Sequence, residues 1–163
     1  MDNRDMKILR LLERDAKLGT RDIATVTELD EEEVSRRIRA LEDSGIIRGY
    51  KCVVDWERLA ADAVSATIQL NVTPKEGLGF EDVARRIAGY PEVESVALMS
   101  GSCDLLVTVK DKSFHRLSSF VARELATIES VNSTVTQFIM RRYKDFGILL
   151  SDEKSDERSV LSL

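Results

Sequence analysis

Apolar side chains recur with helical spacing at the start of the chain. Met6, Leu9 and Leu12 lie three residues apart, with Ile8 beside them, and they predict a helix over residues 4–17. A stripe of this kind must be buried against other elements. The pattern therefore favours a helical core in the N-terminal part of the chain.

A second, shorter helix follows at once. Gly19 is expected to end the first helix, and Thr20 is expected to cap the next one. The apolar residues of this second helix are Ile23, Ala24 and Val26.

The third helix is predicted after Asp30. Val34, Ile38 and Leu41 fall on one face of it, and Gly45 ends it. Residues 46–55 then alternate around a glycine and predict a short hairpin or a long bent strand. Three helices and a β-element form a winged helix-turn-helix, with an arbitrary three-helix bundle as the alternative. The close spacing of the second and third helices favours the DNA-binding version.

The second half alternates between strand patterns and amphipathic helices. The order is β-α-β-β-α-β, the ferredoxin-like arrangement, so the fold class is α+β. Both helices would then cover one face of a four-stranded sheet and leave the other face free for a partner. The predicted strands are 63–72, 93–100, 103–110 and 133–143, and the predicted helices run through Phe80–Ile87 and Phe114–Leu125.

The composition limits the location and the partners. The 163 residues carry a net charge of −5, with 43% hydrophobic and 33% charged side chains. No run approaches the roughly 18 apolar residues of a membrane span, and the start lacks the apolar core of a signal peptide. We therefore expect a cytoplasmic protein with no membrane partner. Cys52 and Cys103 lie in apolar, strand-like runs and are expected to be buried free thiols.

Four consecutive acids open the third helix, although DNA carries a negative charge about every 1.7 Å. Asp30 is expected to cap the helix and Glu33 to complete a capping box, while Glu31 leans toward the protein near the positive end of the helix dipole. Only Glu32 then points outward. It could accept from a cytosine amino group, or it could be a solvated residue that weakens non-specific binding.

Basic side chains point outward from the same helix. Arg36 and Arg39 lie opposite its apolar face, flanked by Ser35 and Arg37. The arginines could read guanine or hold phosphate, or they could form a solvated face paired with acids. Residues 1–55 contain 11 Lys and Arg against 13 Asp and Glu, an unusual balance for a DNA binder. The candidate DNA-binding residues are Thr20, Arg21, Ser35, Arg36, Arg37, Arg39, Arg48 and Lys51.

These motifs together resemble the leucine-responsive regulatory protein/AsnC (Lrp/AsnC) family, the feast/famine regulators. Residues 34–50 (VSRRIRALEDSGIIRGY) are similar to its recognition helix and exit strand, and residues 133–144 (STVTQFIMRRYK) to its closing strand. Residues 100–107 (SGSCDLLV) resemble its sensor hairpin, in which a Gly-x-x-Asp segment precedes a strand. The resemblance covers residues 2–144.

The resemblance implies a sequence-specific DNA-binding transcriptional regulator that responds to an amino acid or related metabolite. Its implied partners are double-stranded DNA, that effector, and further copies of the chain as a homodimer or an octamer. We expect a winged helix-turn-helix over 1–55, a linker over 56–62, a βαββαβ sensor (RAM) domain over 63–144 and a polar tail over 145–163. The implied effector-binding residues are Ser100, Gly101, Ser102, Cys103 and Asp104.

The residues of this loop suit such a ligand. Asp104 could accept from an α-ammonium, and N–H groups beside Gly101 could hold a carboxylate. Alternatively, Gly101 is a turn residue and Asp104 a strand-edge charge.

The sequence departs from the family in two places. Cys103 is smaller than the usual aromatic residue, which changes the pocket's shape. Glu28 stands where the turn often carries Gly, and it disfavours a left-handed conformation, so a wider turn is expected.

Two other functions remain open. An enzyme similar to the sirohaem decarboxylases could use the same scaffold, but its site would need a convergent His or Arg. The single histidine, His115, is expected on a helix surface, and neither catalytic residues, a metal site nor a cofactor is predicted. The other alternative is a metabolite-sensing or oligomerisation module without DNA binding, which the acidic N-terminal part motivates.

Overall fold

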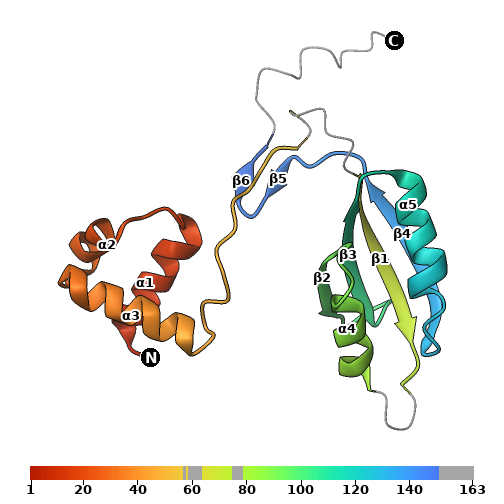
Figure 1. The fold of residues 1–163 in the computed structure, drawn as a ribbon, viewed down its shortest axis with the longest axis horizontal. Coiled ribbons are helices and arrows are strands. Elements are labelled where there is room, and N and C mark those ends of the chain that lie inside the picture. The colour runs from red at the N-terminus through yellow and green to blue at the C-terminus, as the bar shows by residue number, and fades with distance from the viewer. Residues whose placement is uncertain (57, 59–63, 75–78, 151–163) are drawn as a thin grey trace. The chain divides into compact units, whose positions relative to one another are not determined.

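Contacts divide the computed structural model into two compact units, Met1–Val54 and Asp55–Leu163 (Figure 1). The structure describes residues 1–56, 58, 64–74 and 79–150. Residues 57 and 59–62 of the predicted linker, and the predicted tail from residue 151 on, lie outside the described residues. No helix in the described ranges is long and apolar enough to cross a membrane.

Three helices build the N-terminal unit: α1 (Asn3–Arg14), α2 (Thr20–Thr27) and α3 (Glu31–Asp43). The predicted apolar faces meet in one core. Helix α1 ends before residue 17, because the chain turns at Asp15, the C-cap. Gly19 is therefore the N-cap of α2 rather than the end of α1, and the prediction that Thr20 caps α2 is wrong. The buried core residues are Ile8, Leu12, Ile23, Ala24, Val34 and Leu41.

The turn between α2 and α3 is left-handed, contrary to our expectation. Glu28 has φ 57° and ψ 41°. This conformation lets the N–H groups of Glu28 and Leu29 both donate to the carbonyl of Ala24, which satisfies the end of α2. These two hydrogen bonds keep the turn tight. A glycine at position 28 would adopt the same left-handed conformation at a lower free-energy cost.

The predicted β-element after α3 is wrong for this structure. No strand is found among the described residues between Ser44 and Trp56. The N–H groups of Ile46 and Ile47 both donate to the Leu41 carbonyl at 3.0 Å, so the chain first closes the helix end. The alternation continues beyond this point, but none of the described strands pairs with it. Cys52 is consequently exposed rather than buried, whereas Cys103 is buried as predicted.

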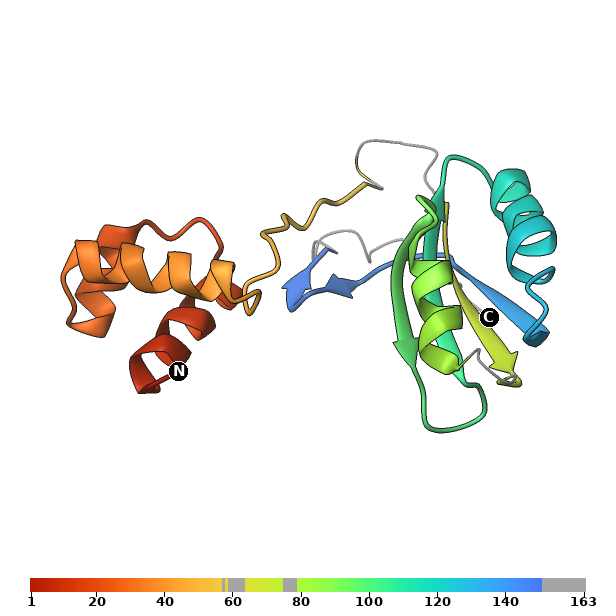
Figure 2. The ribbon, with the colours of Figure 1, turned by 60° about the horizontal axis from the view of Figure 1, so that its bottom comes forward.

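The second unit has the predicted β-α-β-β-α-β order (Figure 2). Its four strands pair antiparallel in the order β2-β3-β1-β4. Inward side chains of the central strands pack with α4 and α5 into one core, so both helices lie on the same face of the sheet. The elements are β1 (Val64–Val72), α4 (Phe80–Ala88), β2 (Val93–Leu98), β3 (Leu105–Asp111), α5 (Phe114–Phe120), a π-helical turn η2 (Val121–Leu125) and β4 (Val131–Ile139).

A small hairpin, β5 (Lys144–Asp145) and β6 (Ile148–Leu149), follows the sheet. Its turn residues Phe146 and Gly147 have φ of 43° and 82°, and two positive φ values are typical of a type I′ turn. Residues 145–149 belong to the segment predicted as a polar tail. That assignment is wrong here, because it overlooked the glycine that allows the turn.

No described helix covers the face of the sheet away from α4 and α5, which is called the open face below. Strand register places Ala97, Leu106, Gln69 and Val135 in one row across all four strands on this face. Val135 is 50% exposed. The row is a mixture of apolar and polar side chains, as expected for a surface that can be covered by another polypeptide.

Candidate DNA-reading surface and effector loop

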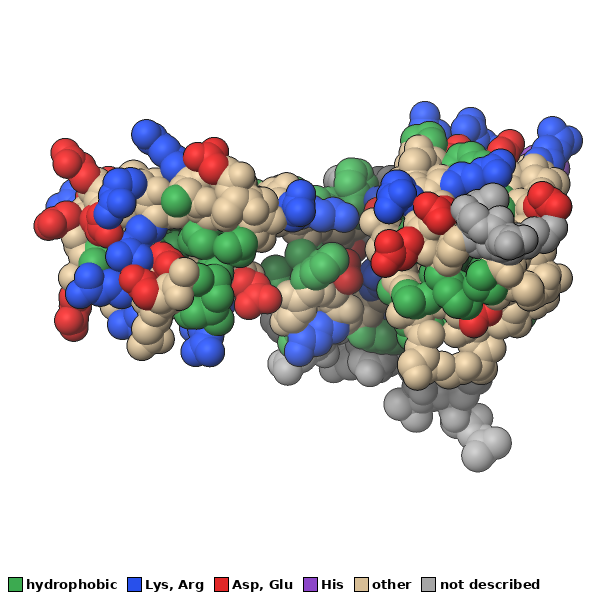
Figure 3. Space-filling view, turned by 90° about the horizontal axis from the view of Figure 1, so that it is seen from below, with side chains coloured by type: hydrophobic (Ala, Val, Ile, Leu, Met, Phe, Trp, Pro, Cys, Tyr) green, Lys and Arg blue, Asp and Glu red, His purple; other side chains and the backbone are tan. Residues whose placement is uncertain are grey.

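The outer face of α3 gathers part of the predicted DNA-binding set. Ser35, Arg36 and Arg39 line one shallow hollow together with Glu32 and Asp43. Both arginines are exposed, and no ion pair to Arg39 is found within the described ranges. Basic and acidic side chains are interspersed over this unit on the face that Figure 3 shows, without a broad basic patch. A DNA contact on this face would depend on a few individual side chains.

The acids at the start of α3 are used differently from the prediction. Asp30 occupies the N-cap position, but its side chain makes no capping hydrogen bond. Glu33 does not form a capping box, because both of its carboxylate oxygens bind arginines. Glu31 does lean toward the protein, where it accepts a 2.6 Å hydrogen bond from the Thr20 hydroxyl. Glu32 is exposed, as the helical geometry indicates.

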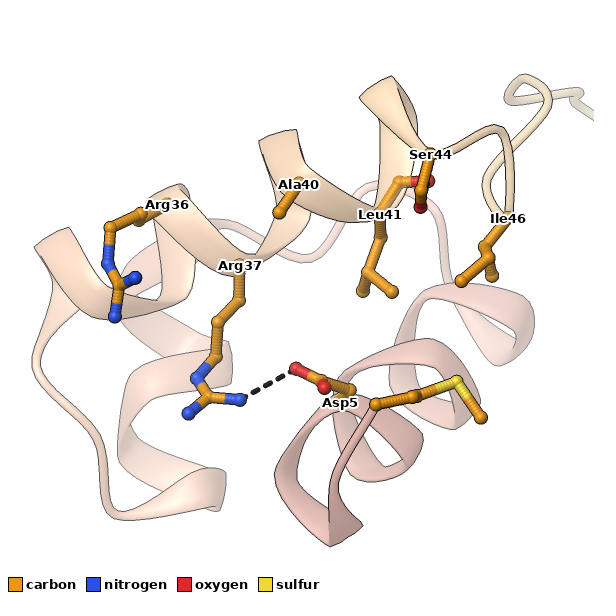
Figure 4. Close-up of a pocket in the computed structure, with 8 residues that line it drawn as sticks. Asp5, Arg36, Arg37, Ala40, Leu41, Ser44 and Ile46 are labelled. Carbon is orange, nitrogen blue, oxygen red and sulfur yellow. Dashed lines mark hydrogen bonds and ion pairs between the residues drawn. The ribbon is translucent and has the colours of Figure 1, made fainter.

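Arg37 belongs to the interior of the unit rather than to its reading surface. Its side chain is only 18% exposed. It extends from α3 toward Asp5 at the start of α1, beside a hollow between the two helices (Figure 4). Its Nη1 lies 2.7 Å from Asp5 and 2.9 Å from Asp2, and its Nε lies 2.7 Å from Glu33. We therefore remove Arg37 from the candidate DNA contacts.

Electrostatics in this cluster favour the charged form of every member. The hydrogen bonds that Arg37 donates to Asp5, then to Glu33 and to Asp2, raise the pKa of Arg37. The pKa of Glu33 is lowered by Arg36 first and by Arg37 second. The pKa of Asp5 is lowered by the backbone N–H of Asp2 and then by Arg37. Three carboxylates and Arg37 thus remain ionised together around the N-terminal end of α1.

The other candidate DNA contacts lie outside α3. Thr20 is half-buried and donates to Glu31, whereas Arg21, Arg48 and Lys51 are exposed. The Arg48 guanidinium folds back toward Gly45, just after the end of α3. A Cβ atom on residue 45 would lie 3.2 Å from the Cζ atom of Arg48.

The predicted effector residues form the loop between β2 and β3. Ser100, Gly101 and Ser102 are exposed at its tip, and Cys103 is buried. Asp104 is partly buried, and its Oδ2 accepts a 2.7 Å hydrogen bond from the N–H of Val72. The loop is thus fixed at its base and open at its tip.

The bond from Asp104 has a structural origin. The pairing of β1 with β4 shifts register between Asn71 and Val72. The carboxylate satisfies the Val72 N–H beside this bulge, while the Asp104 N–H donates to the Leu70 carbonyl at 3.0 Å. The prediction that Asp104 is available to an α-ammonium therefore needs revision, because one of its oxygens accepts from the Val72 N–H and stabilises the sheet at the bulge.

Sequence reasoning missed the Glu33 pairs and their link to α1. The spacing of Glu33 from Arg36 and Arg37, three and four residues, is a signal that could have identified these contacts. The contacts of Arg37 with Asp2 and Asp5 span more than thirty positions, and no local pattern indicates them.

No group of three or more His, Cys, Asp or Glu side chains suited to a metal ion is found among the described residues. His115 is exposed at the second position of α5, as predicted.

Comparison with known proteins assigns each unit. The family model of a winged helix-turn-helix DNA-binding domain matches residues 1–48, and the Lrp/AsnC ligand binding domain matches residues 65–149. The HTH-type transcriptional regulator YugG of Bacillus subtilis is 36% identical over 99% of this chain and 98% of its own. The leucine-responsive regulatory protein of Rhizobium meliloti is 30% identical over 89% and 93%.

Solved structures agree with this assignment. A transcriptional regulator of Neisseria meningitidis, in complex with L-Met, has a TM-score of 0.70 at 26% identity, covering 89% of this chain and 93% of its own. E. coli AsnC, at 21% identity and a TM-score of 0.64 over 87% and 93%, shares the fold. A DNA-binding domain followed by a ligand-binding domain makes the protein a metabolite-responsive transcriptional regulator rather than an enzyme. The chain belongs to the Lrp/AsnC family of transcriptional regulators.

Proposed function

We propose that this regulator reads DNA with Arg36 and Arg39, and that an amino acid bound at the loop Ser100–Asp104 changes its DNA affinity or its assembly. The observation that supports the DNA proposal is the different exposure of the arginines along α3. Arg36 and Arg39 are exposed on the outer face, whereas Arg37 between them is held by carboxylates. The first two are therefore the arginines of this helix that are able to meet a base edge.

The chemistry of these side chains fits the major groove. A guanidinium can donate two parallel hydrogen bonds to O6 and N7 of guanine, and Ser35 can contact any base or a phosphate. Arg21, Arg48 and Lys51 are suited to backbone phosphates, which position the helix without specifying sequence. In a symmetric dimer, the two α3 helices would enter half-sites about 34 Å apart.

Fluorescence anisotropy with two DNA duplexes tests this reading surface. One duplex is selected by the wild-type protein from a random pool, and the other has random sequence. Arg36→Ala and Arg39→Ala should each weaken the selected complex about 5- to 150-fold, the loss expected for one bidentate base contact. Arg85→Ala removes an equally exposed arginine from α4 and should leave the affinity unchanged.

Unchanged binding in both α3 variants would place the DNA contacts elsewhere on the unit. Absence of wild-type binding to every duplex at low salt would instead favour a metabolite-sensing module without DNA binding.

The effector proposal rests on the loop geometry and on one structural neighbour. Backbone N–H groups at the exposed tip, around Gly101, can receive a carboxylate, as in the anion sites formed by successive amides. The neighbour from Neisseria meningitidis was solved with L-Met, an amino acid. Since Oδ2 of Asp104 already accepts from the Val72 N–H, the α-ammonium would use the other oxygen, and a second copy of the chain could supply a further acceptor.

A thermal-shift screen of the common amino acids identifies the effector. The bound amino acid should raise the unfolding temperature of the wild type, and Ser102→Asp should abolish the shift by repelling the ligand carboxylate. Ser118→Asp adds the same charge to an exposed position on α5 and should preserve the shift. Ligand-induced stabilisation that survives Ser102→Asp would locate the ligand away from this loop.

For assembly we propose a homodimer formed by the open sheet face, with stacking of dimers into an octamer. The row containing Leu106 and Val135 supports this proposal, because it presents exposed and half-buried apolar side chains on a face that no described helix covers. Sedimentation equilibrium would determine the number of copies.

A further inference from the structure

Glu33 binds two arginines with its two carboxylate oxygens. Oε1 accepts from Arg37 Nε at 2.7 Å. Oε2 accepts from Arg36 Nε at 3.0 Å and also from Arg36 Nη2. The Arg36 side chain is 73% exposed, whereas that of Glu33 is 25% exposed. Glu33 therefore joins an internal arginine to an arginine on the proposed reading surface.

The internal side of this arrangement is fixed. Arg37 Nη1 donates to Asp5 at 2.7 Å and to Asp2 at 2.9 Å, and both carboxylates belong to the capped start of α1. Glu33 is consequently held from the side of the protein core. If Arg36 moves toward DNA, Glu33 cannot follow it far without breaking its bond to Arg37.

The contact with Glu33 occupies only one edge of the Arg36 guanidinium. A guanidinium carries five N–H donors, and Glu33 uses the Nε–H and one Nη2–H. Two donors on Nη1 and one on Nη2 remain. A parallel pair from Nη1 and Nη2 is able to match O6 and N7 of guanine. Arg36 can thus stay paired with Glu33 and still present an end-on donor pair to a base.

The pairing of Arg36 with Glu33 has a different effect on phosphate binding. Non-specific affinity comes from the neutralisation of phosphate charge by basic side chains and the release of counterions. The charge of Arg36 is already compensated by Glu33, so the arginine offers little net attraction to a phosphate. The same pair therefore weakens charge-driven binding and preserves base-directed donors.

We infer that Glu33 is a specificity-determining positioning residue, which orients Arg36 for base reading and reduces its attraction to the DNA backbone. This inference rests on the proposed role of Arg36 in DNA reading. Glu33 acts through Arg36 and makes no DNA contact of its own.

The test uses the full chain with Glu33→Gln, which keeps an oxygen acceptor for Arg37 and removes the charge. Affinity for a random duplex should rise about three- to tenfold, and the plot of log affinity against log salt should steepen by about one. Affinity for the selected duplex should rise less or fall, so the ratio of specific to non-specific affinity declines. A purely structural role would not increase non-specific affinity.

Glu32→Gln is the matched control. It removes the same charge from the same helix at an exposed position. A double-mutant cycle then separates a general charge effect from an effect through Arg36. In the Arg36→Ala background the effect of Glu33→Gln should disappear, while any effect of Glu32→Gln should persist.

Equal effects of the two glutamine variants in both backgrounds would overturn the inference, and so would an effect of Glu33→Gln that survives Arg36→Ala. If Arg36→Ala itself leaves both affinities unchanged, the proposed reading surface fails first. Arg36→Lys provides a second variant that leaves the Glu33–Arg37 bond intact. It should reduce the selected-duplex affinity while keeping random-duplex affinity, because an ammonium keeps the charge without the paired donors. Retained selectivity in this variant would contradict the orienting role.

Discussion

Arg37 Nη1 lies 2.7 Å from Asp5 Oδ1, and this contact joins the recognition helix to the first turn of α1. Asp5 is also the acid of the α1 capping box, where its other oxygen accepts from the Asp2 N–H at 2.8 Å. Asp2 in turn caps α1 with one oxygen and binds Arg37 with the other. The same two carboxylates therefore cap the N-terminus of α1 and bind Arg37 of α3.

Arg37→Met should destabilise the N-terminal unit and reduce its sensitivity to acid. Asp5 and Glu33 have lowered pKa values in the folded protein. The stability that these two carboxylates contribute to the folded unit is complete above their ordinary pKa values, 3.8 for Asp5 and 4.5 for Glu33. It is lost as the pH falls through their lowered pKa values in the folded protein. Urea unfolding of the wild type should show this loss below about pH 5, and the variant should show a flatter dependence.

Arg10→Met is the control for this prediction. Arg10 is an exposed arginine on α1. Its replacement should leave both the stability at neutral pH and the slope toward acid close to those of the wild type. An Arg37→Met protein with the full acid sensitivity of the wild type would show that Arg37 adds nothing to the effects of the Asp2 N–H on Asp5 and of Arg36 on Glu33.

The fold was predictable where burial alone sets the pattern. Val34, Ile38 and Leu41 share a helix face because one side of α3 must be apolar, and they do pack toward the core. Strand β1 was predictable for the same reason, since Ile68 and Leu70 are buried and alternate with polar neighbours. Residues 46–55 show the limit of this reasoning. Alternation indicates which side chains could be buried, but not whether a partner strand is present.

The candidate site was predictable only in part. Helical geometry placed Arg36 and Arg39 outward, which the structure bears out through their exposure. The same geometry put Arg37 at the flank and could not indicate Asp2 and Asp5, since these acids approach only after α1 packs beside α3. Asp104 is a similar case, because the bulge that engages its carboxylate arises from strand pairing with β4.

Glu28→Gly should stabilise the N-terminal unit by about 0.5–1 kcal/mol. Glu28 has a φ of 57°, and an L-residue in the left-handed region costs roughly 1–2 kcal/mol, part of which glycine's greater unfolded-state entropy offsets. Glu28→Ala keeps the Cβ and should change little, which separates backbone strain from the loss of a charge. Equal stabilisation by both variants, measured by urea unfolding, would assign the effect to charge.

Asp104→Ala should destabilise the sensor domain by about 1–3 kcal/mol, because it leaves the partly buried Val72 N–H without an acceptor. Asp104→Asn retains an oxygen acceptor and should cost less. Denaturant unfolding monitored with and without the effector distinguishes this role from ligand binding. An Asn variant of normal stability that binds no effector would restore Asp104 as a ligand contact.

Val135→Asp should dissociate the proposed dimer. Val135 is 50% exposed on the open sheet face and pairs in register with Gln69, beside Leu106 on the next strand. If this face is covered by a second copy, the new carboxylate loses its hydration at the interface and has no partner there, which is strongly unfavourable. If the face is free in solution, the substitution is a surface change and the assembly is unaffected.

Sedimentation equilibrium at several protein concentrations measures this outcome directly. We expect the variant to shift toward the monomer mass while keeping the circular dichroism of a folded protein. Ser118→Asp, on the helical side of the same domain, should keep the wild-type mass. In the proposed dimer two reading helices would contact adjacent half-sites, so monomeric Val135→Asp should also bind a two-half-site duplex no better than a duplex with one half-site. A variant that remains dimeric would move the interface to another surface of the chain.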